Sequence, residues 1–413
     1  MSKRSNFQII FVLGWLSAIG PFSIDMYLPG FPAIAKDLNT DIAHISLSLS
    51  SFFIGISVGQ IIYGPLVDRF GRKKPMYAGL LLYVLTSIGC TFGNSADALM
   101  VLRFLQALGA CVGMVASRAM VRDLFSVTET AKVFSLLMLI VGVSPIIAPT
   151  LGGYVTAVLG WRYVFVVLTL IAICILLGVY FFLPESRQPD PHYSLKPRVI
   201  LGNFRDVIRD SQFVTYAFTG ALATAGLYAY IAGSPAVFMK IYNVTEKQYG
   251  WIFALIALGL IISSQLNSVL LRNFKSEQII RIALLAQSST GILLFAGTIA
   301  GVWDLFSTIF LIFVFLCCQG FTFPNSSALS LAPFSRNAGS ASALMGAIQM
   351  GVGTLSSALV NVFANGTALP MTCIMACCAI SSFSVLMTGR RIIRIRATAA
   401  VVNEETGDMI SKL

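Results

Sequence analysis

A short polar and charged segment, Gly64 to Lys74 (GPLVDRFGRKK), separates two long apolar runs near the start of this chain. The runs extend from Ala43 to Tyr63 and from Pro75 to Phe92. Each is close to the length, about 20 residues, that an α-helix needs to cross the hydrocarbon layer of a membrane. The core of a soluble protein does not require this arrangement. We therefore expect a tight turn between two membrane-spanning helices.

The rest of the chain has the same apolar character. Charged residues make up 11% of the 413 residues and hydrophobic residues 57%, whereas soluble globular domains carry about 25% charged residues. This composition predicts an all-α membrane protein. Apolar runs separated by polar breaks predict twelve transmembrane helices. They are expected to start near Phe7, Ala43, Pro75, Ala98, Val133, Tyr163, Phe213, Tyr249, Ile279, Leu305, Ala338 and Ala368.

Basic residues are distributed unevenly over the connecting loops. With the N-terminus in the cytoplasm, 23 of the 28 Lys and Arg residues fall on the cytoplasmic side and one, Arg103, falls inside a span. The remaining four fall outside: Lys36, Arg162, Lys240 and Lys247. Membrane proteins carry such an excess on their cytoplasmic loops. We therefore expect both termini to be cytoplasmic and anionic membrane lipids to be partners of the basic face. Nucleic acid is not expected, because no soluble basic domain is present.

The longest segment between spans, Glu185 to Ser211, contains three prolines and a short amphipathic stretch around Phe204 to Ile208. It divides the spans into six and six. We expect an N-terminal six-helix bundle in residues 1–184, a cytoplasmic linker in 185–211, a C-terminal six-helix bundle in 212–391 and a cytoplasmic tail in 392–413. The segment Leu271 to Lys275 (LRNFK) weakly repeats Val67 to Arg72 (VDRFGR) at the equivalent place in the second half.

The polar segment at Gly64 to Lys74 resembles motif A of the major facilitator superfamily. The resemblance implies that family's fold, in which two pseudo-symmetric six-helix bundles enclose a central cavity. It also implies that Asp68 contacts the start of the eleventh span near Asn337 to Ser340 and locks one conformation. The residues of this conformational latch would be Gly64, Asp68, Arg69, Gly71 and Arg72. The residues themselves support a tight turn at Gly71 and a carboxylate suited to a helix start. A merely solvated basic turn is the alternative.

A second segment, Leu99 to Ala110 (LMVLRFLQALGA), resembles motif B of the same superfamily. Arg103 and Gln106 are three residues apart and therefore share one face of a helix. An Arg inside a membrane costs about 2.5 kcal/mol or more, so it usually faces a cavity or a partner. Two roles stay open for Arg103: a functional role in the cavity, or an anchoring role through backbone carbonyl groups.

A third segment, Gly142 to Tyr154 (GVSPIIAPTLGGY), resembles motif C, which is typical of antiporters in this superfamily. The direction of transport is implied only by this resemblance. The residues themselves predict a kinked helix that packs closely on a neighbour, and a simple packing seam is the alternative. The residues concerned are Gly142, Pro145, Pro149, Gly152 and Gly153.

The segment Ser23 to Pro29 (SIDMYLP) resembles the Bcr/CflA family of drug:proton antiporters, which confer resistance to bicyclomycin and chloramphenicol. The resemblance extends across all twelve spans. Asp25 is the one carboxylate that the sequence places within a span. A carboxyl group removed from water favours its neutral form, which makes proton uptake feasible near neutral pH. We expect Asp25 and Arg103 to couple transport to protons. An interfacial position of Asp25 is the alternative.

These observations predict a proton-coupled multidrug efflux transporter, a monomer of the bacterial inner membrane driven by the proton gradient without a cofactor. Its substrates would be small hydrophobic or cationic drug-like molecules. Residues proposed to bind them are Phe22, Asp25, Tyr27, Gln60, Arg103, Gln106, Tyr228, Asn325 and Gln349. An exporter of one endogenous metabolite on the same fold is the alternative. An enzyme is not expected, because both histidines, His44 and His192, lie outside the predicted cavity and no metal-binding cluster or phosphate-binding loop is visible.

Overall fold

The computed structural model describes residues 3–125, 127–189, 197–334 and 338–411. These residues form helices and no strand. Twelve long helices are present: α1 (Lys3–Asp25), α3 (Ile42–Phe70), α4 (Lys73–Thr91), α5 (Ala96–Leu124), α6 (Val127–Leu159), α7 (Arg162–Phe182), α9 (Ser211–Pro235), α10 (Glu246–Leu270), α11 (Ser276–Ala300), α12 (Leu305–Leu331), α13 (Ala338–Val362) and α14 (Leu369–Ser411). The predicted all-α fold with twelve spans is confirmed.

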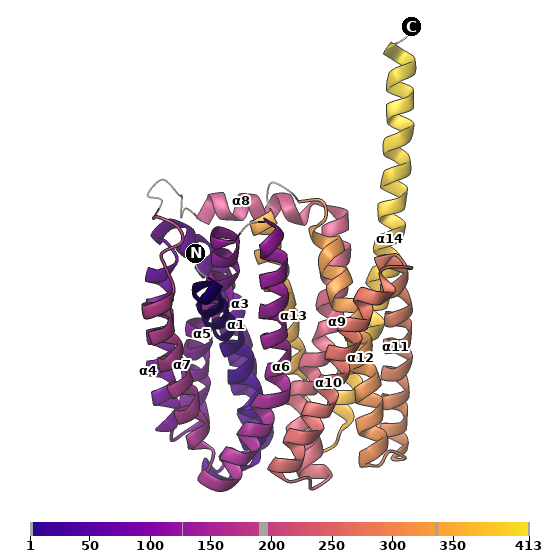
Figure 1. Ribbon diagram of the computed structural model, residues 1–413. Coiled ribbons are helices and arrows are strands. Elements are labelled where there is room, and N and C mark those ends of the chain that lie inside the picture. Colours follow the sequence, from indigo (N-terminus) through magenta and orange to yellow (C-terminus); the bar gives the residue numbers. More distant parts are fainter. Residues whose placement is uncertain (1–2, 126, 190–196, 335–337, 412–413) are drawn as a thin grey trace.

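Eleven helices within the described residues are long and apolar enough to cross a membrane. The twelfth, α4, has 19 residues and begins with two lysines, which lowers its hydropathy. It packs against α5 and α7 and runs beside the other spans (Figure 1). We therefore count α4 with them.

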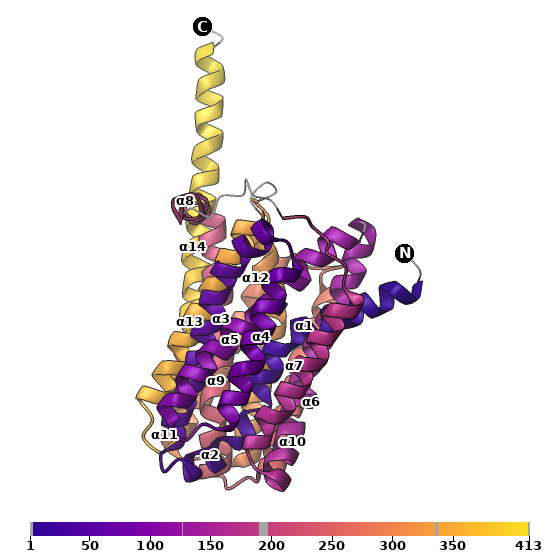
Figure 2. The same ribbon diagram turned by 90° about the vertical axis from the view of Figure 1, so that its left-hand side faces the viewer.

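Four shorter elements complete the chain. They are η1 (Leu28–Gly30), α2 (Phe31–Asp37), α8 (Pro197–Ile208) and the π-helix η2 (Ala236–Ile241). The helix α1 ends at Asp25, and two prolines that follow, Pro29 and Pro32, cannot donate a backbone hydrogen bond, so the chain continues as η1 and α2. Helices α8 and α2 lie at opposite ends of the bundle (Figure 2). We call these the α8 end and the α2 end.

The helices form two halves that lie side by side (Figure 1). Equivalent helix pairs pack in each half. In the first half α5 packs against α3 and α4, and α4 also packs against α7. In the second half α12 packs in the same way against α10 and α11, and α11 also packs against α14. The halves meet mainly through α3 with α13 and through α6 with α10. This repetition gives the pseudo-symmetry that the sequence predicted.

Two features lie at or beyond the α8 end. Helix α8 includes the predicted amphipathic stretch and contacts α9 and α13 (Figure 1). Helix α14 extends past the bundle to Ser411, so residues 392–411 continue the last span as one helix of 43 residues. The outward faces of the spans carry exposed aromatic and aliphatic side chains such as Phe306 and Val158, as expected for helices in contact with lipid.

Candidate functional site

A cavity of about 200 Å³ lies between the two halves. It is lined from one half by α1, α3, α5 and α6 and from the other by α9, α10, α12 and α13. The lining is apolar and aromatic, with Asp25 as the one charged side chain among the described residues that form it. A site shared by both halves can be opened or closed when one half moves against the other.

Asp25 is the last residue of α1, and it is 4% exposed. No ion pair connects its carboxylate to any described residue. The carbonyl end of a helix also carries partial negative charge, which further disfavours an isolated anion there. The site therefore favours either a proton on Asp25 or a bound cation beside it.

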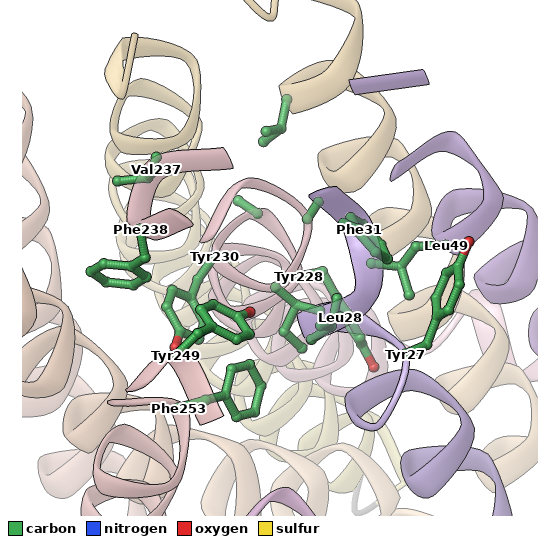
Figure 3. Close-up of a cluster of buried hydrophobic side chains, with 14 of the residues drawn as sticks. Tyr27, Leu28, Phe31, Leu49, Tyr228, Tyr230, Val237, Phe238, Tyr249 and Phe253 are labelled. Atoms are coloured by element: carbon green, nitrogen blue, oxygen red, sulfur yellow. The ribbon is translucent and has the colours of Figure 1, made fainter. Parts of the chain in front are cut away.

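Aromatic side chains from the second half line the cavity together with Asp25, and Figure 3 shows three of them, Tyr228, Tyr230 and Phe253, within a buried cluster. Tyr230 stacks on Phe253 with ring centroids 5.6 Å apart, and Tyr228 packs edge-on against Phe53 at 4.6 Å. The hydroxyl of Tyr228 donates to the sulfur of Met350 over 3.5 Å. The hydroxyl of Tyr230 is buried and has no hydrogen-bond partner among the described residues. Tyr230 itself lines the cavity.

Arg103 is fully buried and does not line this cavity. Its Nη1 donates to Oε1 of Gln106 over 2.5 Å, and its Nη2 donates to the backbone carbonyl of Ser23 over 2.9 Å. The guanidinium lies over the rings of Phe52 and Tyr27, at 4.2 and 4.6 Å. Of the two roles left open by the sequence, this geometry corresponds to anchoring. Arg103 holds the end of α1 rather than pairing with Asp25.

The other proposed substrate residues lie in helix contacts. Of the nine, only Asp25 and Tyr228 line the cavity. Phe22 packs on Trp15, with centroids 5.4 Å apart, and the hydroxyl of Tyr27 shares a hydrogen bond of 2.9 Å with Ser48.

The polar residues among these nine form hydrogen bonds with other side chains or lie against glycines. Gln106 donates to Ser87 over 2.6 Å, and Asn325 donates to Asn267 over 2.6 Å. Gln60 faces Gly346, and Gln349 is buried near Gly220. Sequence reasoning did not identify Tyr230, Phe253 and Met350, which do line the cavity. The sequence feature that could have indicated them is an aromatic or sulfur-containing side chain within a predicted span.

The loop between α3 and α4 is held by a network of charges. Arg72, 3% exposed, donates to Asp68 over 2.7 Å and to Asp123 over 2.8 Å. Burial lowers the pKa of Arg72, but its hydrogen bonds to Asp123 and Asp68 outweigh that effect and raise the pKa overall. Arg187 adds a longer contact of 3.4 Å to Asp68. Asp123, from the end of α5, was not predicted, although it closes the network.

Backbone geometry fixes the same loop. Gly71 has φ +82°, a conformation that glycine adopts without steric cost. Glu185, which follows α7, accepts hydrogen bonds from the backbone N–H groups of Arg72 and Lys73 at 2.7 and 3.1 Å.

Other parts of the expected latch are placed differently. A Cβ at Gly64 would meet no atom within 4 Å, so no helix crossing requires glycine there. Arg69 lies over the ring of Phe70 at 5.8 Å. The expected contact of Asp68 with Asn337 to Ser340 involves Asn337 and the side chains of 338–340, which lie outside the described residues.

The segment that resembles motif C packs α6 against α10 near the α2 end. A Cβ at Gly250 would come within 2.9 Å of the backbone of Pro149 and Thr150, and one at Gly153 would collide with the backbone of Glu246. Gly152 faces the backbone of Met26, next to Asp25, and Gly142 lies near Ile261. Pro145 lines the cavity. The contacts between α6 and α10 join the two halves.

No group of three or more His, Cys, Asp or Glu side chains in the described part of the chain is arranged to hold a metal ion.

Comparison with known proteins identifies relatives of similar length. The Major Facilitator Superfamily model matches residues 13–358. The chain is 33% identical over 375 residues to the uncharacterized MFS-type transporter YdgK of Bacillus subtilis, covering 90% of this chain and 92% of the relative. It is 32% identical over 382 residues to the bicyclomycin resistance protein homolog of Haemophilus influenzae, covering 92% and 95%. It is 29% identical over 369 residues to the multidrug resistance protein MdtL of Escherichia fergusonii, covering 89% and 92%.

Among solved structures, the fold is similar to that of a bacterial homolog of the human lysosomal transporter Spinster in an inward-facing, unoccupied conformation. The TM-score is 0.69 at 13% sequence identity, and the match covers 94% of this chain and 96% of that one. At this identity the comparison supports the fold alone.

Proposed function

Because this chain belongs to the Major Facilitator Superfamily and is of the bicyclomycin-resistance (Bcr/CflA) type, we propose that it is a proton-coupled exporter of apolar, cationic drug-like molecules. The observation that carries this proposal is the position of Asp25, a buried carboxylate without an ion-pair partner in the described residues, in the wall of an aromatic cavity. The names of two relatives, a bicyclomycin resistance protein homolog and a multidrug resistance protein, support the choice of substrate class.

The cavity favours cations with apolar bodies. Its walls offer Tyr228, Tyr230 and Phe253, and a positive charge near aromatic rings gains about 0.5–2 kcal/mol. Asp25 supplies an opposite charge in a site from which water is largely excluded, where electrostatic attraction is stronger than in water. The hydroxyl of Tyr230 can orient a substrate that carries a hydrogen-bonding group.

Proton coupling follows from competition at Asp25. An ionised Asp25 holds a cationic substrate, whereas a protonated Asp25 does not attract it. Proton and substrate therefore exclude each other at one carboxyl group, and a carrier that changes conformation only when one of them is bound exchanges one for the other. A ligand shifts a conformational equilibrium only through different affinities for the two states. We propose that this difference arises at the contacts of α1 with α6 and of η1 with α10, which lie close to Asp25 in the chain.

The distribution of cations supports a proposed orientation of the molecule in the membrane. Lys36, Arg162, Lys240 and Lys247 lie at the α2 end, in or next to α2, α7, η2 and α10, and they are the four that the sequence placed outside. We propose that the α8 end, with both termini, faces the cytoplasm, since basic residues concentrate there. Anionic lipids would bind that face, and the carrier would act as a monomer in the bacterial inner membrane.

The test uses the purified full chain in proteoliposomes with an imposed pH gradient and the lipophilic cation tetraphenylphosphonium as the transported probe. Wild type should transport the probe in the direction opposite to the flow of protons. Asp25→Asn should lose proton-driven transport while remaining folded. Asp97→Asn, which alters an exposed carboxylate in contact with His44, is the matched control and should transport normally. Full proton-driven transport by Asp25→Asn would refute the proposal.

A susceptibility panel in a pump-deficient bacterium tests the breadth of the substrate range. Resistance to several unrelated cationic drugs is expected with wild type and not with Asp25→Asn. Protection against a single compound alone would instead favour the export of one metabolite.

A further inference from the structure

A second cavity, of about 130 Å³, lies at the α2 end. It is lined by the first residues of α3, by the end of α9 with η2, and by the loop that joins α13 to α14. The first of these elements belongs to the N-terminal half and the others to the C-terminal half. None of its lining residues lines the central cavity. It is therefore a separate site that also spans the boundary between the halves.

The rim of this cavity carries two charges of opposite sign, Asp41 and Lys240. No ion pair joins them to each other or to another described residue. One oxygen of Asp41 accepts the backbone N–H of His44 over 2.6 Å at the start of α3. Its other oxygen and the Lys240 ammonium have no hydrogen-bond partner among the described residues, which leaves an acceptor and a donor available at one opening.

A third polar group lies deeper. Asn361 is 9% exposed, and its side-chain Nδ2 is buried without a hydrogen-bond partner among the described residues. A buried donor without a partner is unfavourable, so an occupant with an acceptor atom at this point would be favoured. The rest of the lining includes the apolar Ala232, Val237 and Met371. It also includes the polar Ser46, Asn365 and Thr367, which hydrogen-bond within the protein.

We propose that this cavity binds a small zwitterion of the α-amino acid class. Lys240 and Asn361 are both donors and match a carboxylate, whereas Asp41 matches an ammonium group. A ligand with only a carboxylate leaves Asp41 without a partner, and a ligand with only an ammonium group leaves Lys240 without one. At about 130 Å³ the cavity is smaller than the central one and suits a ligand of few non-hydrogen atoms.

Binding at this place has a consequence for the carrier. Within the lining, Ser46 of α3 donates to the carbonyl of Ala232 in α9 over 3.1 Å, a direct bond between the halves. A zwitterion held by Asp41 from one half and by Lys240 and Asn361 from the other adds a second connection. Because these groups come from both halves, it binds only while the halves are in contact at the α2 end, and it therefore stabilises that arrangement and slows turnover.

The test measures binding by calorimetry on the full chain in nanodiscs, with L-alanine as the probe. Propionate carries only the negative charge of L-alanine, and ethylammonium carries only the positive charge. Saturable binding is expected for L-alanine and at least tenfold weaker binding for the two half-ligands. Lys240→Gln and Asn361→Ala should each weaken L-alanine binding at least tenfold, whereas Lys36→Gln, an exposed cation at the same end but outside this cavity, should not.

Absence of saturable L-alanine binding, equal binding of propionate, or unchanged binding by Lys240→Gln would each overturn the proposal. Because binding is measured without transport, its outcome is independent of whether the chain exports drugs. In proteoliposomes that do transport, L-alanine on the side of the α2 end should slow wild type and not Lys240→Gln. Equal slowing of both would overturn the regulatory part.

Discussion

Arg103 donates a hydrogen bond from Nη2 to the backbone carbonyl of Ser23, two residues before Asp25, over 2.9 Å. Ser23 lies in the last turn of α1, where carbonyl groups have no partner within the helix and a cation is favourable. The second nitrogen of the guanidinium is held by Gln106. Arg103 thus fixes the helix end that carries Asp25, although it does not touch the carboxylate.

Arg103→Lys keeps the positive charge but removes the planar guanidinium group, which donates to Ser23 and to Gln106 at the same time. Hydrogen bonds to charged groups contribute about 1.5–3 kcal/mol each, so we expect a clearly lower apparent melting temperature and weaker binding of a cationic substrate. Intrinsic tryptophan fluorescence during heating measures the melting temperature, and calorimetry measures the binding of the substrate. Arg281→Lys, on an exposed face of α11, serves as the control. An unaltered melting curve for Arg103→Lys would contradict the anchoring role.

The pair Tyr230 and Tyr249 separates substrate contact from stability. Tyr230→Phe removes a hydroxyl without a partner among the described residues, so stability should be unchanged while affinity for substrates with hydrogen-bonding groups falls about 2–10-fold. Tyr249→Phe removes a hydroxyl bonded to Ser234 over 2.8 Å, so stability should fall and substrate affinity should not. Melting curves and binding titrations on both variants check this. The reverse pattern would show that Tyr230 is only a packing residue.

The contact between α6 and α10 is expected to control closure of the α2 end. Gly250→Leu places a side chain where the backbone of Pro149 lies within 2.9 Å of a Cβ, so the two halves must separate there and transport should drop at least tenfold. Double electron–electron resonance between spin labels at Val158 and Asn243 should report a longer mean distance. Gly64→Ala is the control, because a Cβ there meets open space. A distance distribution identical to wild type would rule out this contact as a gate.

Asp123 is expected to matter more than its position at the end of α5 suggests. Asp123→Asn removes one of two carboxylates from the nearly buried Arg72. Because Asp68 remains and Asp123 is 20% exposed, the cost should be about 1–3 kcal/mol rather than that of a fully buried broken pair. For a domain of 150–250 residues this corresponds to a melting temperature lower by about 2–4 °C per kcal/mol.

Asp97→Asn is the comparison for this prediction. It alters an ion pair whose two side chains are 41% and 84% exposed, and exposed pairs contribute little. The melting temperature of Asp97→Asn should therefore stay close to wild type. Equal melting temperatures for the Asp123 and Asp97 variants would argue against a structural role of the Arg72 network.

The number and type of helices could be predicted because a membrane requires about 20 apolar residues per span, and that requirement is visible in the sequence. The end of α1 at Asp25 and the continuation of α14 to Ser411 were not predicted. The first depends on two prolines and on packing against Arg103. The second involves residues too polar to register as a span, and hydropathy carries no information on whether such residues remain helical.

The candidate site was predictable only in part. Asp25 was found because a lone carboxylate in a span is costly and therefore conspicuous. Tyr230 and Phe253 were missed, because aromatic residues are as common on packing faces as on cavity walls. Arg103 and Asn325 were assigned to the cavity because polarity indicates a need for partners but does not identify them. Asp123 pairs with a residue 51 positions away, a distance at which single-sequence patterns carry no signal.

The ionisable group and the segment that covers the α2 end of the cavity are neighbours along the chain. Asp25 ends α1, and η1 begins at Leu28, where it contacts α6, α9 and α10. Whatever changes the charge at Asp25 therefore acts on η1 through three peptide bonds. A change of charge at Asp25 can therefore reach η1 without a long series of side-chain contacts across the protein. Mutations distant from residues 23–31 should change the rate of transport more readily than they abolish transport.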